Sequence, residues 1–340
     1  MRSNPILLFL ATVLLTVSLS CENGQSTQEE NPLPDETPAP SRAYKVPAFI
    51  ADSAYSFVEK QVDFGPRVPN SDGHSQTKEW LVGKLQSYGL NVIRQDFQAI
   101  AYTGAVLNGT NIIAEYNPAA RRRILLAAHW DTRHIADSPL SQERQGEPIL
   151  GADDGGSGVG ILLEIARQLQ VNPIEAGDLG VDLILFDLED YGESGGKENS
   201  YCLGSQHWAR NLHHPDYRPQ YGILLDMVGT AGARFTKDQV SMAYAGPIMN
   251  KVWSLAKAMG FGHLFVDIPS GGLIDDHYYV NTIAGIPMID IINKPAGSST
   301  GFGAHWHTHD DDMDVIDRST LRAVGQVLLA EVYREAGGSY

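Results

Sequence analysis

The chain has 340 residues, of which 43% are hydrophobic and 19% charged, so it carries enough apolar material for one large buried core. Its formal net charge is −16, and this argues against nucleic acid as a partner, because binding to phosphates requires clustered Lys and Arg. The short basic run Arg121–Arg123 does not change this, and it is interpreted as a turn that enters a strand.

The N-terminal region is expected to lie outside the fold. Residues 1–20 contain an apolar run at 5–19 that is shorter than the roughly 20 residues a membrane-spanning helix needs, and Cys21 follows it. This pattern is typical of an export signal of the lipoprotein type; a plain signal peptide is the alternative, because Ser18 stands where lipoprotein signals usually carry Leu. Residues 21–42 are polar and Pro-rich, which predicts a disordered tether. We therefore expect an exported, membrane-anchored lipoprotein that faces the periplasm or the cell surface and meets the membrane only through a lipid on Cys21.

Residues 43–340 have the pattern of a single α/β domain. Short apolar runs that suit buried strands alternate with longer runs of helical periodicity. Strands are expected at 92–97, 111–116, 123–128, 181–186, 223–227 and 286–292, and helices at 74–88, 158–169, 247–259, 276–284 and 319–335. This alternation predicts a central, mostly parallel, twisted mixed sheet flanked by helices on both faces. Ligands of such sheets gather beyond the carboxyl ends of the strands.

Acidic and imidazole side chains follow four of these predicted strands. The segments concerned are HWD after RILLAA, DLED after DLILF, Asp226 after YGILL, and the loop after IDIIN that ends in HWH. A fifth, glycine-rich segment offers Asp153 and Asp154 ahead of a helix. Carboxylates at this density repel one another, and a divalent cation relieves that cost. Mixed His and carboxylate ligands with one open position are typical of catalytic zinc.

Seven segments, in this order, resemble those of the zinc-dependent aminopeptidase family that also contains the glutaminyl cyclases. They are AHWDTR (128–133), GADDGGSGVG (151–160), FDLEDYG (186–192), LGSQHWA (203–209), DMVG (226–229), DDHYYV (275–280) and HWHTHDD (305–311). The resemblance extends from about residue 43 to 335, and within it HWDTR and CLGSQHWA look like the bacterial cyclases in particular. It implies a zinc aminopeptidase-like fold for the catalytic domain.

The resemblance also implies a metal centre. One zinc ion would be held by Asp154, Asp190 and His307, with Asp190 in a place where Glu is commoner. His129 and Asp131 would belong to a candidate second metal pocket, which the aminopeptidases fill and the cyclases do not normally use. The acids 310–312 would either orient His307 or form a solvated loop.

The same resemblance assigns catalytic roles. Glu189 would be the general acid and base, and Asp226 and Asp275 would form a hydrogen-bonding network beside it that contacts the substrate. Trp306 would wall a narrow glutamine pocket, with ordinary core packing as its alternative role. Asp275 stands where the peptidases tend to have Ser, and capping of the next helix is its alternative role. Cys202 is expected to be a buried small side chain.

Three functions follow from this reading. The first is a glutaminyl-peptide cyclotransferase, which converts the N-terminal glutamine of peptides and proteins to pyroglutamate and releases ammonia. The second is a dinuclear zinc aminopeptidase, because every ligand type for two ions is present. The third, a non-catalytic binding protein, is disfavoured because Glu189 and all the ligand types are retained.

Overall fold

A six-stranded mixed sheet forms the centre of the domain in the computed structural model, which describes residues 43–175, 178–196 and 199–338. The predicted export signal and tether lie outside the described residues. The strands, in spatial order, are β1 (Asn91–Ile100), β2 (Val106–Tyr116), β4 (Gly180–Phe186), β3 (Arg123–His129), β5 (Gly222–Asp226) and β8 (Met288–Ile292). The pairs β4–β3, β3–β5 and β5–β8 are parallel, and β1–β2 and β2–β4 are antiparallel. The predicted, mostly parallel sheet is thus confirmed.

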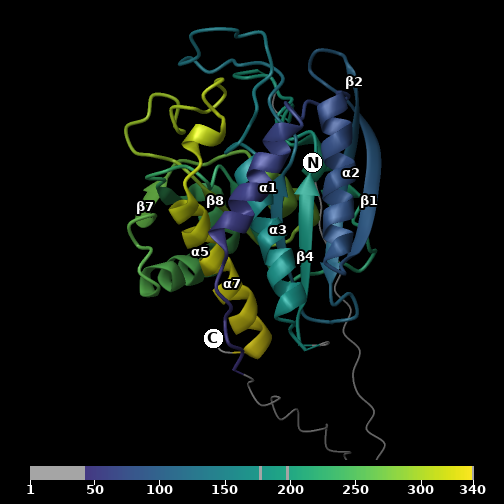
Figure 1. Cartoon of the computed structure of the whole chain (residues 1–340), viewed down its shortest axis with the longest axis vertical. Helices are drawn as coiled ribbons and strands as arrows, with labels where there is room; N and C mark the ends of the chain where they lie inside the picture. Colours follow the sequence, from purple (N-terminus) through teal and green to yellow (C-terminus); the bar gives the residue numbers. More distant parts are fainter. Residues whose placement is uncertain (1–42, 176–177, 197–198, 339–340) are drawn as a thin grey trace, which may run out of the picture. The chain divides into compact units, whose positions relative to one another are not determined.

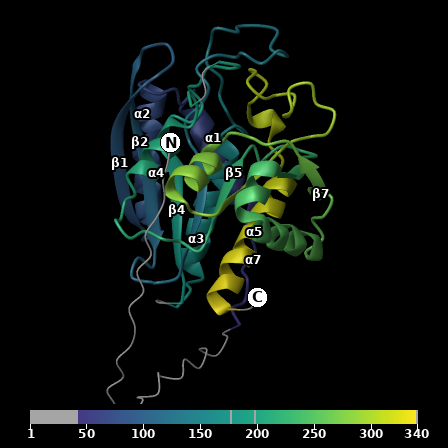
Figure 2. The ribbon, with the colours of Figure 1, turned by 180° about the vertical axis from the view of Figure 1, so that it is seen from behind.

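Helices cover both faces of this sheet. The helices α1 (Ala51–Asp63), α2 (Asp72–Ser87), α3 (Gly156–Val171), α5 (Gln239–Ala258) and α7 (Arg318–Gly337) contribute to one apolar core (Figure 1). The opposite face is covered by α4 (Leu203–Arg210) and by the π-helical turn Val280–Ala284 that continues α6 (Asp276–Tyr279) (Figure 2). No helix within the described ranges is long and apolar enough to cross a membrane.

The parallel strands are buried along their whole length because each face meets a helical layer. In β3, Ile124 and Leu126 belong to the core under α3, whereas Leu125 and Ala127 belong to the core under α4. Alternate side chains of a strand point to opposite faces, so a strand covered on both sides must be apolar at every position. This is why the sequence reads here as continuous hydrophobic runs.

Several elements differ from the sequence prediction. The helix expected at 247–259 begins earlier, because the side chain of Asp238 accepts hydrogen bonds from the first N–H groups and the helix then continues through a kink at Ala245, two residues before Pro247. The helix expected at 276–284 is a short α-turn followed by a π-helix. Helices α1 and α4 and the small parallel pair β6 (Phe235–Asp238) and β7 (Phe265–Ser270) were not predicted.

Candidate metal centre and active site

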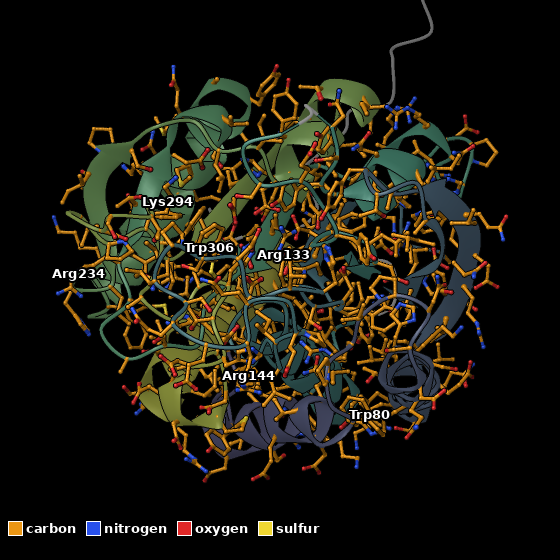
Figure 3. The ribbon with its side chains drawn as sticks, turned by 90° about the horizontal axis from the view of Figure 1, so that it is seen from above. Trp80, Arg133, Arg144, Arg234, Lys294 and Trp306 are labelled. Carbon is orange, nitrogen blue, oxygen red and sulfur yellow. The ribbon has the colours of Figure 1, made fainter. Side chains whose placement is uncertain are left out.

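The polar residues predicted to carry the chemistry meet at the carboxyl edge of the parallel strands. β3 ends at His129, β5 ends at Asp226, and Glu189 and Asp190 lie three and four residues beyond the end of β4. Figure 3 looks down on this edge, with Trp306 near the middle of the view. The strand register therefore brings together side chains that are far apart in the sequence.

Asp154, Asp190 and His307 form a compact donor set. One potential ligand atom from each lies within 4.8 Å of the others, and all three residues are buried. The Nε2 atom of His307 lies 3.1 Å from Oδ1 of Asp190 and 3.8 Å from Oδ2 of Asp154. Oδ2 of Asp190 is buried and receives no hydrogen bond from the described residues. An orphaned carboxylate oxygen beside a correctly directed imidazole fits a zinc ion, which binds such oxygen and nitrogen ligands.

A carboxylate that was not predicted to take part holds His307 in place. The Nδ1 atom of His307 lies 2.9 Å from Oδ1 of Asp137, which leaves Nε2 directed at the two aspartates. The indole of Trp306 stacks on the imidazole at 3.8 Å between ring centroids. Of the acids at 310–312, Asp311 is buried and accepts the main-chain N–H groups of Asp153 and Asp154 at 2.7 and 3.1 Å. It therefore holds the loop that carries Asp154 and makes no hydrogen bond to His307.

Glu189 lies beside this donor set, at the wall of a cavity. It follows Leu188, whose left-handed backbone (φ +56°) turns the chain sharply after β4. Desolvation by the surrounding protein raises the pKa of Glu189 well above its usual value, and the positive field of His129 partly opposes this, while Asp190 reinforces it. A raised pKa makes a carboxylate a better proton acceptor, which suits a group that must take up a proton and then give it back.

Cys202 donates two hydrogen bonds to Glu189, which the sequence did not predict. Its thiol donates to Oε1 of Glu189 at 3.1 Å, and its N–H donates to the Glu189 carbonyl at 2.8 Å. Burial raises the pKa of this thiol well above its usual value, so the group stays a donor. The only sequence signal was the position of the cysteine just ahead of LGSQHWA.

A second donor set shares Asp154. The Nε2 atom of His129 lies 3.0 Å from Oδ1 of Asp154 and 3.2 Å from Oδ1 of Asp226. One potential ligand atom from each of these three residues again lies within 4.8 Å of the others. Asp131, which was expected in this pocket, lies behind it: its carboxylate accepts the main-chain N–H groups of Glu189 and Asp190 at 3.0 and 3.1 Å. Asp131 thus supports the loop after β4.

A cavity of about 230 Å³ opens onto the first donor set and onto Asp154 and Asp226 of the second. Its wall includes Asp154, Glu189, Asp190, Tyr201, Asp226, Ile274, Asp275, Phe302, Trp306 and His307. Asp275 also caps α6, because its Oδ1 accepts the N–H of Asp276. Asp275 therefore caps the helix and also lines the cavity, so the capping role does not exclude the predicted contact with a substrate. A cavity of this size, below the usual range for drug-sized ligands, suits one amino-acid residue.

The sheet, its helical layers and this histidine–carboxylate edge define a zinc-exopeptidase type of protein. Residues 111–332 match the model of peptidase family M28, and the chain belongs to that family.

Solved structures and curated relatives agree with this assignment. A Zn-dependent exopeptidase from Parabacteroides distasonis is 46% identical with a TM-score of 0.82, covering 85% of this chain and 99% of its own. The glutaminyl cyclase of Bacteroides thetaiotaomicron, solved with bound N-acetylhistamine, is also 46% identical with a TM-score of 0.81, covering 85% and 99%. The glutaminyl-peptide cyclotransferase of Drosophila melanogaster is 26% identical over 280 residues, 75% of this chain and 73% of its own.

Proposed function

We propose that this protein is a zinc-dependent glutaminyl-peptide cyclotransferase. It converts the N-terminal glutamine of peptides and proteins to pyroglutamate and releases ammonia. The observation that carries the proposal is the cavity whose wall combines the Asp154–Asp190–His307 donor set with four further residues, Glu189, Asp226, Asp275 and Trp306. The likeness of this chain to proteins named as glutaminyl cyclases supports the same activity.

The reaction is intramolecular, so the protein mainly orients one residue. The α-amine of the substrate attacks the carbonyl carbon of its own side-chain amide. A C–N bond forms at this carbon, and the bond from the same carbon to the amide nitrogen breaks. When bound by Asp154, Asp190 and His307, a zinc ion supplies a Lewis acid for the γ-carbonyl oxygen. Because the nucleophile is already attached, positioning provides a large effective concentration.

The chain's own residues handle the proton and the nitrogen atoms. Glu189 takes a proton from the attacking amine and delivers it to the departing amide nitrogen, which leaves as ammonia. Asp226 and Asp275 accept hydrogen bonds from the substrate's N–H groups on the cavity wall. Trp306 covers the side chain of the glutamine and limits the access of water, so hydrolysis does not compete.

The second candidate is a dinuclear aminopeptidase, favoured by one observation: His129, Asp154 and Asp226 form a further donor set that shares Asp154 with the first. Purified protein incubated with a Gln-initiated dipeptide and with a leucyl anilide separates the two functions. The cyclase releases ammonia and forms the ring without cleaving the anilide, with one zinc per chain. Cleavage of the anilide without ring formation would overturn the proposal.

The N-terminal sequence adds a location to this proposal. An export signal over residues 1–20 and a lipid on Cys21 would place the enzyme outside the cytoplasm, on a tether over residues 21–42. Labelling of cells with radioactive palmitate, compared with a Cys21→Ala variant, tests this. Lipid on the wild type and none on the variant is the expected result.

A further inference from the structure

The side chain of Arg133 connects two of the proposed metal ligands. It is fully buried, although an unpaired charge inside a protein is costly. Its Nη1 atom donates to the main-chain carbonyls of Asp190 and Gly192, at 2.9 and 2.8 Å. Its Nε and Nη2 atoms donate to the two carboxylate oxygens of Asp137, at 3.1 and 2.6 Å. One guanidinium thus fastens the loop after β4 to the segment that follows β3.

Asp137 also contacts His307. The oxygen that accepts from Arg133 Nε also lies 2.9 Å from Nδ1 of His307. The carboxylate can only accept, so Nδ1 carries the hydrogen of this contact, and Nε2 is the nitrogen left to bind a metal ion. Asp137 and His307 are 170 positions apart in the sequence, and this contact sets the orientation of the imidazole.

We propose that Arg133 and Asp137 form a positioning pair that sets the zinc affinity of the site. The pair holds the backbone of Asp190 and the ring of His307 at a fixed separation, so that two ligands from different segments meet the ion together. This inference rests on the proposed function, because it takes Asp154, Asp190 and His307 as the zinc ligands. Neither residue of the pair lines the cavity, so neither acts on the substrate directly.

The choice of arginine follows from the geometry. A planar fork can bind both oxygens of a carboxylate and still direct a third nitrogen at two carbonyls, which the single ammonium of lysine cannot do. The guanidinium also packs over the ring of Tyr201, with 5.2 Å between its central carbon and the ring centroid. Partners that orient a metal-bound histidine typically change metal affinity 10–100-fold when they are replaced.

The chain offers a matched control for this pair. Arg144 follows in the same connecting segment and pairs with Glu147 at 3.6 Å, but both side chains are more than half exposed. In the view from above, Arg144 lies apart from Arg133 (Figure 3). Arg144→Lys therefore replaces an arginine of the same connecting segment whose side chain pairs with none of the proposed zinc ligands.

The experiment measures the zinc dissociation constant of the full chain by competition with a chromogenic chelator, alongside the melting temperature of the zinc-free protein. We expect Asp137→Asn and Arg133→Lys to weaken zinc binding by roughly 10–100-fold, and Arg144→Lys to leave it unchanged. Zinc affinity within twofold of the wild type in Asp137→Asn would overturn the inference, as would an effect confined to the melting temperature. If Arg133→Lys does not fold, Asp137→Asn decides alone. A wild-type chain that binds no zinc would instead overturn the proposed function and, with it, this inference.

Discussion

Replacement of Glu189 by glutamine isolates the proposed proton transfer from every other property of the site. The substitution is isosteric, and glutamine keeps a carbonyl oxygen that accepts from the Cys202 thiol, now at 3.1 Å from Oε1. The N–H of residue 189 still donates to Asp131, so the loop after β4 keeps its main-chain support. What is lost is the group that can take up and release a proton.

The expected loss in kcat is 10²–10⁴-fold, the usual contribution of general acid–base catalysis, or about 3–5 kcal/mol in the activation barrier. Stability should not fall. The surrounding protein already favours the neutral form of Glu189, and the nearby Asp190 and Asp275 add to this, so a neutral side chain removes repulsion. Zinc content should also be unchanged, because Glu189 is not among the three proposed ligands.

The assay couples ammonia release from a Gln-initiated dipeptide to a dehydrogenase, with zinc per chain and thermal unfolding measured on the same preparations. Glu143→Gln is the control, because that glutamate is exposed and lies outside the cavity wall. Turnover of Glu189→Gln within tenfold of the wild type would show that the proton travels by another route. Loss of zinc together with turnover would show that Glu189 supports the metal instead.

Three further outcomes are expected. Removal of metal by a chelator should abolish turnover, and one equivalent of zinc per chain should restore it; a requirement for two would favour the peptidase. Cys202→Ala should lower kcat several-fold with little change in KM or zinc content, whereas Cys202→Ser, which keeps a donor, should recover most of the activity; equal rates for both variants would remove the thiol from the positioning of the general base. Burial, reinforced by His214, lowers the pKa of His213 to about 4, and Trp208 donates to its Nδ1 at 3.1 Å. The neutral imidazole is therefore favoured in the folded state, so stability should fall between pH 6.5 and 4, by up to about 3 kcal/mol, and urea unfolding of His213→Asn should show a correspondingly weaker dependence on pH.

The sheet could be predicted because its strands are covered on both faces. Full burial makes each of them an uninterrupted apolar run, which is a local signal. Helix α1 lacks such a signal at its start, since Ile50 precedes it and provides no side-chain cap. Helix α4 has only eight residues. It starts after Cys202, whose backbone is left-handed and whose side chain provides no cap. The pair β6 and β7 lies outside the main sheet, and a proline such as Pro269 in β7 weakens the sequence signal of a strand.

The convergence of the polar residues could be predicted for a related reason, whereas the individual ligands were implied only by the family resemblance. Polar residues that follow buried parallel strands emerge at one edge of the sheet, so Asp190 and Asp226 were expected at the same edge. The residues that orient them follow no such rule. Asp137 reaches His307 from a segment without regular structure. Cys202 contacts Glu189, which directly follows the left-handed residue Leu188. These contacts depend on loop conformations, which hydrophobic periodicity does not encode.

The ligand types alone do not distinguish a cyclase from a peptidase, because both donor sets are complete. The distinction lies in what faces the open side of the metal position. A serine at residue 275 would cap α6 about as well as aspartate does. Capping uses only Oδ1 of Asp275, however, while Oδ2 is buried and receives no hydrogen bond from the part of the chain that the structure describes. Since a buried acceptor without a donor is costly, this oxygen favours a ligand that brings N–H groups into the cavity, as an attacking amine and a departing amide both do.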